Sequence, residues 1–220
     1  MERKIKFAID EHYHIYSRGV EKRKIFLNKS DYKRFVSLLY IMNQPKSFHF
    51  QNFLQKHTIS DIFKEERKDT LVDIISYVLM PNHFHILIYE KEEGGISKFM
   101  MKLLTAYSMY FNTKYKRSGP LFVHPFRSQF IADDPYYLWI FSYIHLNPIK
   151  LIQPDFKENG IKNIVECKKF LMSYEYSSYV DYLGYPRGIS NIINFSIIPE
   201  YIKKNSLDLD FYTKNMEGYP

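Results

Sequence analysis

The sequence predicts a fold that combines β-strands with α-helices, and three stretches indicate this. Residues 74–79 and 83–88 are two apolar, β-branched runs on either side of Met80-Pro81-Asn82, a pattern typical of two strands joined by a tight turn. Residues 96–115 instead repeat apolar side chains at helical spacing. Asp133-Asp134-Pro135 then provides a helix start, and Pro148 a helix end, around a third apolar segment.

The elements before the paired strands are predicted from local patterns. Residues 7–20 indicate a first strand that ends near Arg18-Gly19. Ser30 or Asp31 is expected to cap a helix that reaches about Asn43 and is ended by Gln44-Pro45. Residues 48–54 are interpreted as a strand, and residues 61–69 as a charged segment.

The elements after the paired strands begin with the helix of residues 96–115, whose apolar face is expected to be core. That face consists of Ile96, Phe99, Met100, Leu103, Leu104, Tyr107 and Phe111. A further strand is predicted within residues 121–130, followed by the helix of residues 134–147. Residues 151–165 are interpreted as a loop and residues 166–184 as containing a short helix, whereas no motif follows Pro186.

Composition limits the class of protein. A hydrophobic fraction of 45%, with 18% aromatic residues, is ample for a core. No run approaches the ~20 apolar residues of a membrane span, and the opening MERKIKF lacks the features of a secretory signal. The single cysteine, Cys167, excludes an internal disulfide and a cysteine-based zinc cluster. We therefore expect a cytoplasmic protein that does not associate with membranes.

Basic charge is concentrated in the first two thirds of the chain. Residues 1–150 carry 23 Lys and Arg against 15 Asp and Glu, whereas residues 151–220 carry 8 against 9. This asymmetry favours a polyanionic partner, most simply nucleic acid. The basic residues predicted to contact phosphates are Arg18, Lys116, Arg117 and Arg127. A solvated loop is an equal interpretation for the cluster that follows Arg18.

Two histidines on the second paired strand are candidate metal ligands. Side chains alternate along a strand, so His83 and His85 are expected on one face and Phe84 on the other. Two adjacent imidazoles form half of a divalent-metal site, although the same spacing also occurs in exposed or hydrogen-bonded histidines. His12 and His14 repeat the spacing but are interpreted as ordinary strand residues, because no partner for them is evident.

The helix of residues 134–147 carries a phenol and an amide one turn apart. Tyr143 and Asn147 share one face of this helix. Two imidazoles and an amide oxygen could hold a divalent cation and leave positions for substrate oxygens, and such a cation polarises a phosphodiester. A tyrosine can serve as the covalent nucleophile. Together these residues indicate DNA strand transfer through a phosphotyrosine link.

Several sequence blocks also resemble one family, in family order over residues 12–184. The blocks are HIYSRGV from His14, MPNHFH from Met80, GPLF from Gly119, FRS from Phe126, YIHLNP from Tyr143 and YSSY from Tyr176. They are similar to those of HUH-type single-tyrosine transposases, especially the REP-associated tyrosine transposases and related insertion-sequence enzymes. The MPNHFH and YIHLNP blocks together are quite specific.

The resemblance implies a fold, a site and a substrate. The fold would be an α+β, ferredoxin/RRM-like sandwich, with a central antiparallel sheet and helices packed on it. His83 and His85 would bind Mg²⁺ or Mn²⁺, Tyr143 would be the nucleophile, and Asn147 would be the third metal ligand, where related enzymes often have glutamine. The substrate would be single-stranded or hairpin DNA, cleaved to a 5′-phosphotyrosine and a free 3′-hydroxyl.

The resemblance also divides the chain and leaves its assembly open. Residues 1–184 would form the catalytic domain, and residues 185–220 a C-terminal extension of unknown role. The protein would act as a monomer or a homodimer, since the two branches of the family differ in this respect.

Three other functions compete with this interpretation. A domesticated protein could bind repeat hairpins without cutting them, although all four candidate catalytic residues are present. An RNA-binding module of the RRM type would need stacking aromatics on a basic sheet. A zinc hydrolase would need a carboxylate or a third histidine beside the histidine pair.

Overall fold

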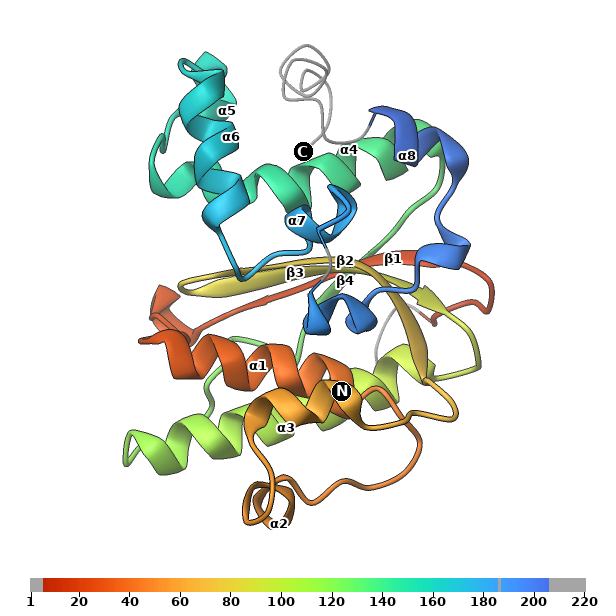
Figure 1. Ribbon diagram of the computed structural model, residues 1–220, viewed down its shortest axis with the longest axis vertical. Coiled ribbons are helices and arrows are strands. Elements are labelled where there is room, and N and C mark those ends of the chain that lie inside the picture. Colours follow the sequence, from red (N-terminus) through yellow and green to blue (C-terminus); the bar gives the residue numbers. More distant parts are fainter. Residues whose placement is uncertain (1–5, 186, 206–220) are drawn as a thin grey trace.

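The computed structural model describes residues 6–185 and 187–205, and its centre is one four-stranded antiparallel sheet (Figure 1). The spatial order of the strands is β2-β3-β1-β4. The elements that build the sheet alternate in the βαββαβ order of ferredoxin-like folds. In chain order they are β1 (His12–Arg18), α1 (Lys29–Ile41), β2 (Val72–Met80), β3 (His83–Glu90), α3 (Gly95–Lys114) and β4 (Arg127–Phe130). The predicted α+β sandwich is confirmed.

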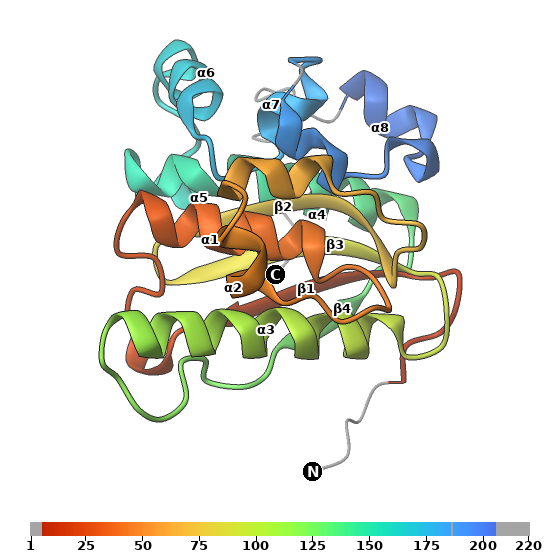
Figure 2. The ribbon, with the colours of Figure 1, turned by 60° about the horizontal axis from the view of Figure 1, so that its bottom comes forward.

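Helices α1 and α3 lie side by side on one face of the sheet (Figure 2). All seven residues of the predicted apolar face of α3 are buried, as expected for core. The ring of Phe35 in α1 packs 5.1 Å from Phe84 of β3 and 4.9 Å from Tyr107 of α3, measured between centroids. These contacts bury Phe84 on the side of β3 that faces α1 and α3.

Helix α4 (Asp134–Leu146) covers the opposite face (Figure 1). The Asp133 side chain caps it by accepting from the Tyr136 amide at 2.7 Å, as the sequence predicts. The predicted end at Pro148 is only partly right, because a 3₁₀ turn, η3 (Asn147–Leu151), continues the chain. Proline is tolerated in the first turn of a helix, where no N–H bond is needed. Asn147 therefore keeps helical backbone angles of φ −51° and ψ −37°.

Three local predictions are wrong. Residues 48–54 are not a strand but contain the short helix α2 (Phe50–Leu54). In so short an apolar run, the helical and strand periodicities cannot be told apart. The cap of α1 is Asn28, whose side chain accepts from the amides of Ser30 and Asp31 while the Asp31 carboxylate accepts from the Asn28 amide. The expected loop of residues 151–165 contains α5 (Phe156–Asn159), which one buried phenylalanine anchors.

The remaining elements follow α5 or connect the sheet strands. They are η1 (Val20–Lys22), η2 (Ile59–Lys64), α6 (Ile164–Ser173), α7 (Tyr179–Tyr182), η4 (Gly188–Ile192), η5 (Phe195–Ile197) and α8 (Glu200–Asn205). The described part of the predicted C-terminal extension packs on the core: Ile193 bridges to Ile74 of β2, and Ile198 and Ile202 are buried. The boundary at residue 184 stays a prediction. Among the described residues, no helix is both long and apolar enough to cross a membrane.

Candidate active site

Strand β3 presents its two histidines to the layer occupied by α4. The centroids of the His83 and His85 rings are 5.0 Å apart, while Phe84 points the other way, 5.1 Å from Phe35. Strand alternation therefore places the imidazoles on one face, as predicted. β3 is an inner strand, hydrogen-bonded to β1 on one side and to β2 on the other, so the positions of the two histidines are fixed by the sheet.

Helix α4 brings Tyr143 to this pair. Its ring lies 5.2 Å from His85, edge to face, and stacks on Trp139 one turn earlier at 5.2 Å with an interplanar angle of 4°. Asn147 is 1% exposed and lies close enough to shift the pKa of both His83 and Tyr143. The structure thus brings together all four residues predicted from the strand and the helix.

The interpretation of His14 as an ordinary strand residue is wrong, because it has a partner within the site. Its Nε2 lies 2.8 Å from His85 Nδ1, and both rings are buried and nearly parallel. Antiparallel pairing of β1 with β3 sets Tyr16 opposite His85, which makes His14 the diagonal neighbour on the same face. The His12 ring packs against the rings of Tyr89 and Tyr137 instead.

Burial keeps the site histidines neutral. It lowers the pKa of His14 to about 3 and that of His83 to about 4, with the charges of Lys150 and Arg18 adding to the effect on His83. Burial, and then neighbouring charges, hold the pKa of His85 well below its usual value. At neutral pH each imidazole therefore has one protonated nitrogen and one free lone pair.

Hydrogen bonds determine which nitrogen of His83 keeps its lone pair. Asn82 donates from Nδ2 to the Lys22 carbonyl at 3.2 Å, which turns its Oδ1 toward His83 Nδ1 at 2.6 Å. Because that oxygen can only accept, Nδ1 carries the proton and Nε2 keeps the lone pair. If His14 likewise accepts from His85 Nδ1, the lone pair of His85 is also on Nε2.

These residues fit a divalent cation. His85 Nε2 and both amide atoms of Asn147 are buried and have no hydrogen-bond partner among the described residues. Buried polar atoms are rarely left unpaired without a reason, and ligation is one such reason. In the same described part of the chain, no three His, Cys, Asp or Glu side chains are grouped to hold one metal ion.

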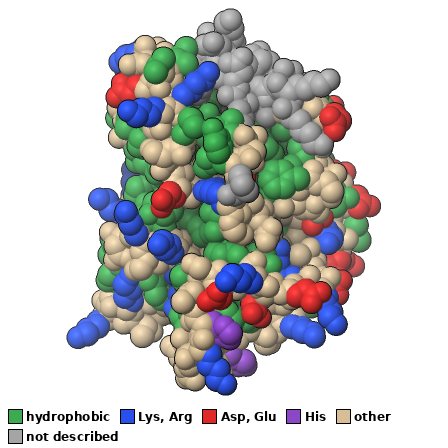
Figure 3. Space-filling view, in the orientation of Figure 1, with side chains coloured by type: hydrophobic (Ala, Val, Ile, Leu, Met, Phe, Trp, Pro, Cys, Tyr) green, Lys and Arg blue, Asp and Glu red, His purple; other side chains and the backbone are tan. Residues whose placement is uncertain are grey.

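A basic cavity of about 310 Å³ opens onto the site. Tyr143, His83 and His85 line it together with Arg18, Arg127 and Lys150. In Figure 3, Lys and Arg side chains stand along the edge of the molecule where the β2–β3 hairpin turns. Arg18 and Arg127 therefore place positive charge on the wall of the cavity that Tyr143 lines.

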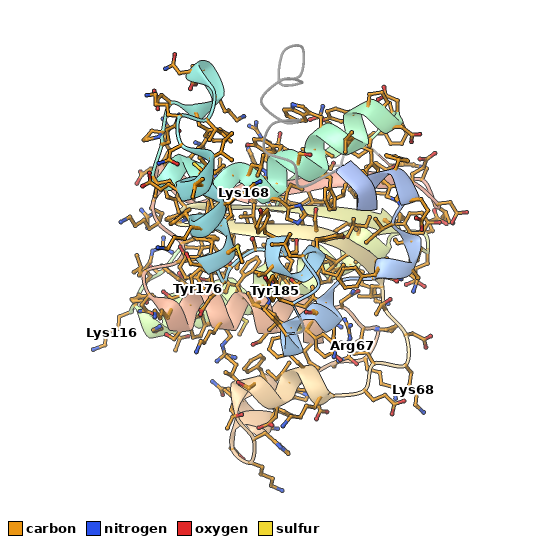
Figure 4. The ribbon with its side chains drawn as sticks, turned by 45° about the horizontal axis from the view of Figure 1, so that its top comes forward. Arg67, Lys68, Lys116, Lys168, Tyr176 and Tyr185 are labelled. Atoms are coloured by element: carbon orange, nitrogen blue, oxygen red, sulfur yellow. The ribbon has the colours of Figure 1, made fainter. Side chains whose placement is uncertain are left out.

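The other two predicted phosphate contacts are not brought to the cavity. Lys116 and Arg117 follow α3, in the layer on the opposite side of the sheet from α4 (Figure 1). Figure 4 shows Lys116 projecting outward from the end of that layer. Arg117 donates to Asn112 Oδ1 at 2.7 Å and to the Pro120 carbonyl. Any DNA contact by these two residues would be remote from Tyr143.

Sequence reasoning missed two lysines, Lys150 and Lys157, which lie beside the site. Lys150 is in η3, and Lys157 is in α5 with its Nζ 4.2 Å from the centroid of the Tyr143 ring. Burial and the charge of Lys150 lower the pKa of Lys157 to about 8. Lys150 follows the predicted helix end at Pro148, and Lys157 lies in residues 151–165, a segment interpreted as loop. Only their positive charge could have drawn attention to them.

Burial also affects the phenol. It raises the pKa of Tyr143 above its usual value, and the adjacent Asn147 side chain only partly offsets this. The site therefore combines a histidine pair and an amide that can hold a cation with a tyrosine that needs positive charge to ionise. The fold and this site define the class of protein: an α+β protein with a histidine pair on strand β3 and a tyrosine on helix α4, which packs over that strand.

The comparisons with known proteins agree with this class. The model of the family described as "Transposase IS200 like" matches residues 9–146, more than half of the chain, and the protein therefore belongs to that family. The resemblance to HUH-type single-tyrosine transposases is thereby confirmed. A comparison with curated proteins gave no match.

One solved structure, that of a REP-associated tyrosine transposase bound to a REP hairpin, shares the fold. It is similar with a TM-score of 0.50 and 14% identity, over 90% of this chain and 99% of that one. At this identity the similarity supports the architecture. The roles of individual residues depend on the geometry described above.

Proposed function

We propose that this member of the IS200-like family cleaves and rejoins single-stranded or hairpin DNA through a covalent 5′-phosphotyrosine intermediate on Tyr143. The observation that carries the proposal is that the Tyr143 phenol and the His83–His85 pair line the same basic cavity. Tyr143 is half-buried, with its ring against the sheet. A single DNA strand can approach such a side chain more easily than a duplex can. The similar solved structure, which holds a REP hairpin, supports this class of substrate.

His83, His85 and Asn147 are the residues that would hold Mg²⁺ or Mn²⁺. A divalent cation there would polarise the phosphodiester and stabilise charge on its leaving oxygen. Imidazole ligands favour Mn²⁺ over Mg²⁺, which prefers an all-oxygen shell. We therefore expect tighter binding of Mn²⁺, activity with either ion and loss of cleavage in EDTA. Full activity in EDTA would remove the metal from the proposal.

The chain's own residues would perform the transfer. The phenolic oxygen of Tyr143 attacks phosphorus as the phenol loses its proton, and the bond from phosphorus to the 3′-oxygen breaks. The 3′-oxygen takes up a proton and leaves as a free hydroxyl, while the 5′-phosphate stays on Tyr143. Rejoining is the reverse step with another 3′-hydroxyl, so the number of phosphodiester bonds is conserved. Arg18 and Arg127 would orient the phosphate from the cavity wall.

Tyr143→Phe tests the proposal because it removes a single oxygen. The variant should keep its fold, bind Mn²⁺ and hairpin DNA, and yet lose both cleavage and the SDS-resistant protein–DNA adduct. The matched control is Tyr137→Phe in the same helix. Its hydroxyl is buried and has no hydrogen-bond partner in the described residues, so its loss should leave cleavage unchanged.

The assay also separates the competing functions. Cleavage by Tyr143→Phe at the wild-type rate would show that water or another group attacks, and the protein would then be a metal-dependent nuclease. Hairpin binding without cleavage by the wild type, with either metal present, would instead indicate a DNA-binding protein of the domesticated kind.

A further inference from the structure

We propose that Lys157 is a catalytic residue whose ammonium group stabilises negative charge on the Tyr143 oxygen as the tyrosine–phosphate bond forms and breaks. This inference rests on the function proposed above and deepens it. The match to the family model covers residues 9–146 and does not include Lys157.

The fold holds Lys157 against the phenol. Its Nζ lies 4.2 Å from the centroid of the Tyr143 ring, within the range of a cation–π contact. The neighbouring Phe156 is fully buried in a small second core with Leu146 and Ile149, which follow Tyr143 on the same helical run. Through Phe156, helix α5 packs against the end of α4, and this packing positions Lys157 next to Tyr143.

The charge of Lys157 lies over the Tyr143 ring. Within the described part of the chain, Lys157 is in no salt bridge, whereas Lys162 of the same segment pairs with Asp155 at 2.6 Å. The lowered pKa of Lys157, about 8, still leaves most of the side chain protonated at neutral pH. An unpaired, partly buried ammonium is costly unless an anion approaches it.

The anion that fits this position is the one that Tyr143 becomes. The half-buried Tyr143 ring packs edge to face against His85, with 5.2 Å between the ring centroids, and a phenolate formed there needs a positive charge beside it. Lys157 would supply that charge from a fixed position during cleavage, and again when Tyr143 leaves during rejoining. It remains protonated throughout and transfers no proton, so the balance of the reaction is unchanged.

Single-turnover cleavage of a hairpin substrate by Lys157→Met and Lys157→Arg tests the assignment. Lys157→Met keeps the length of the side chain without its charge, and we expect a rate about 10²-fold lower, as for other preorganised electrostatic groups. Lys157→Arg should recover much of the rate. Hairpin affinity should stay near that of the wild type in both variants. Lys162→Met, which removes a paired lysine from the same segment, should cleave normally.

A substrate with sulfur in place of the 3′-bridging oxygen distinguishes nucleophile from leaving group. Thiolates leave readily, because a thiol has a pKa near ~8.5, far below that of an alcohol. If Lys157 serves the Tyr143 oxygen, this substrate will not rescue Lys157→Met. Rescue would assign Lys157 to the leaving oxygen and overturn the inference.

The remaining outcomes are also decisive. Normal cleavage by Lys157→Met alongside an active wild type would overturn the role of Lys157 alone. A loss confined to hairpin affinity, with a normal rate at saturation, would reduce Lys157 to a phosphate contact. Absence of cleavage by the wild type would overturn the proposed function and, with it, this inference.

Discussion

Removing the His14 imidazole should weaken metal binding although His14 is not itself a predicted ligand. His14 Nε2 lies 2.8 Å from Nδ1 of His85, whose Nε2 has no hydrogen-bond partner in the described chain. An acceptor at Nδ1 holds the proton there and leaves Nε2 free to ligate. His14→Phe fills the space but accepts nothing, so His85 loses both its orientation and its preferred tautomer.

The size of the effect follows from the lost hydrogen bond. Removing a partner of this kind costs about 10–100-fold in metal affinity. That range corresponds to ~1.4–2.7 kcal/mol, similar to the ~1–3 kcal/mol cost of leaving a buried donor unsatisfied. His14→Gln should lose less, because an amide oxygen can still accept from Nδ1.

Calorimetric titration of the metal-free protein with Mn²⁺ measures this directly, without reference to activity. The matched control is His12→Phe on the same strand, since the His12 ring packs against Tyr89 and Tyr137 and its Nε2 is buried without a hydrogen-bond partner among the described residues. We expect wild-type affinity for His12→Phe and no measurable site for His83→Ala. Unchanged Mn²⁺ affinity in His14→Phe would refute the reasoning.

Three further predictions concern DNA affinity, pH and stability. Hairpin affinity, measured by fluorescence anisotropy, should weaken steeply with salt. Arg18→Ala or Arg127→Ala should each reduce the slope of log affinity against log salt concentration by about 1. An unchanged slope would place these side chains away from phosphates. Burial lowers the pKa of both His14 and His145 to about 3 in the folded state, below the ~6.5 of an unfolded histidine. The unfolded chain therefore binds more protons than the folded protein as pH falls below ~6.5. Urea denaturation should accordingly show stability decreasing from pH 6.5 toward pH 4, by at most ~1.4 kcal/mol per pH unit for each histidine; equal stability at both ends would contradict it. Asp31→Ala should cost about 1–3 kcal/mol in the same assay, because the buried carboxylate binds Lys114 Nζ at 2.6 Å and accepts from the amide of Asn28, the cap of α1. A cost well below ~1 kcal/mol would contradict this.

The elements that carry the site were predictable because their signals are local. Alternation along residues 83–88 places His83 and His85 on one face wherever the strand lies. The spacing of Tyr143 and Asn147 places both on one side of a helix, and the Asp133 cap marks its start without reference to the rest of the fold. The distance between these two pairs was not predictable from spacing. It followed only from the family resemblance, and the structure confirms that the pairs are adjacent.

What the sequence alone determined is thus which residues face the same way, because side-chain direction depends on the backbone period of a single element. What only the tertiary structure decided is which residues of different elements meet. His14 contacts His85 because β1 pairs with β3, and Lys157 reaches Tyr143 because Phe156 packs α5 against the end of α4. Lys116 and Arg117 fall outside the cavity because α3 packs on the other face of the sheet. Strand pairing and helix docking depend on contacts between distant segments, which periodicity within one segment does not encode.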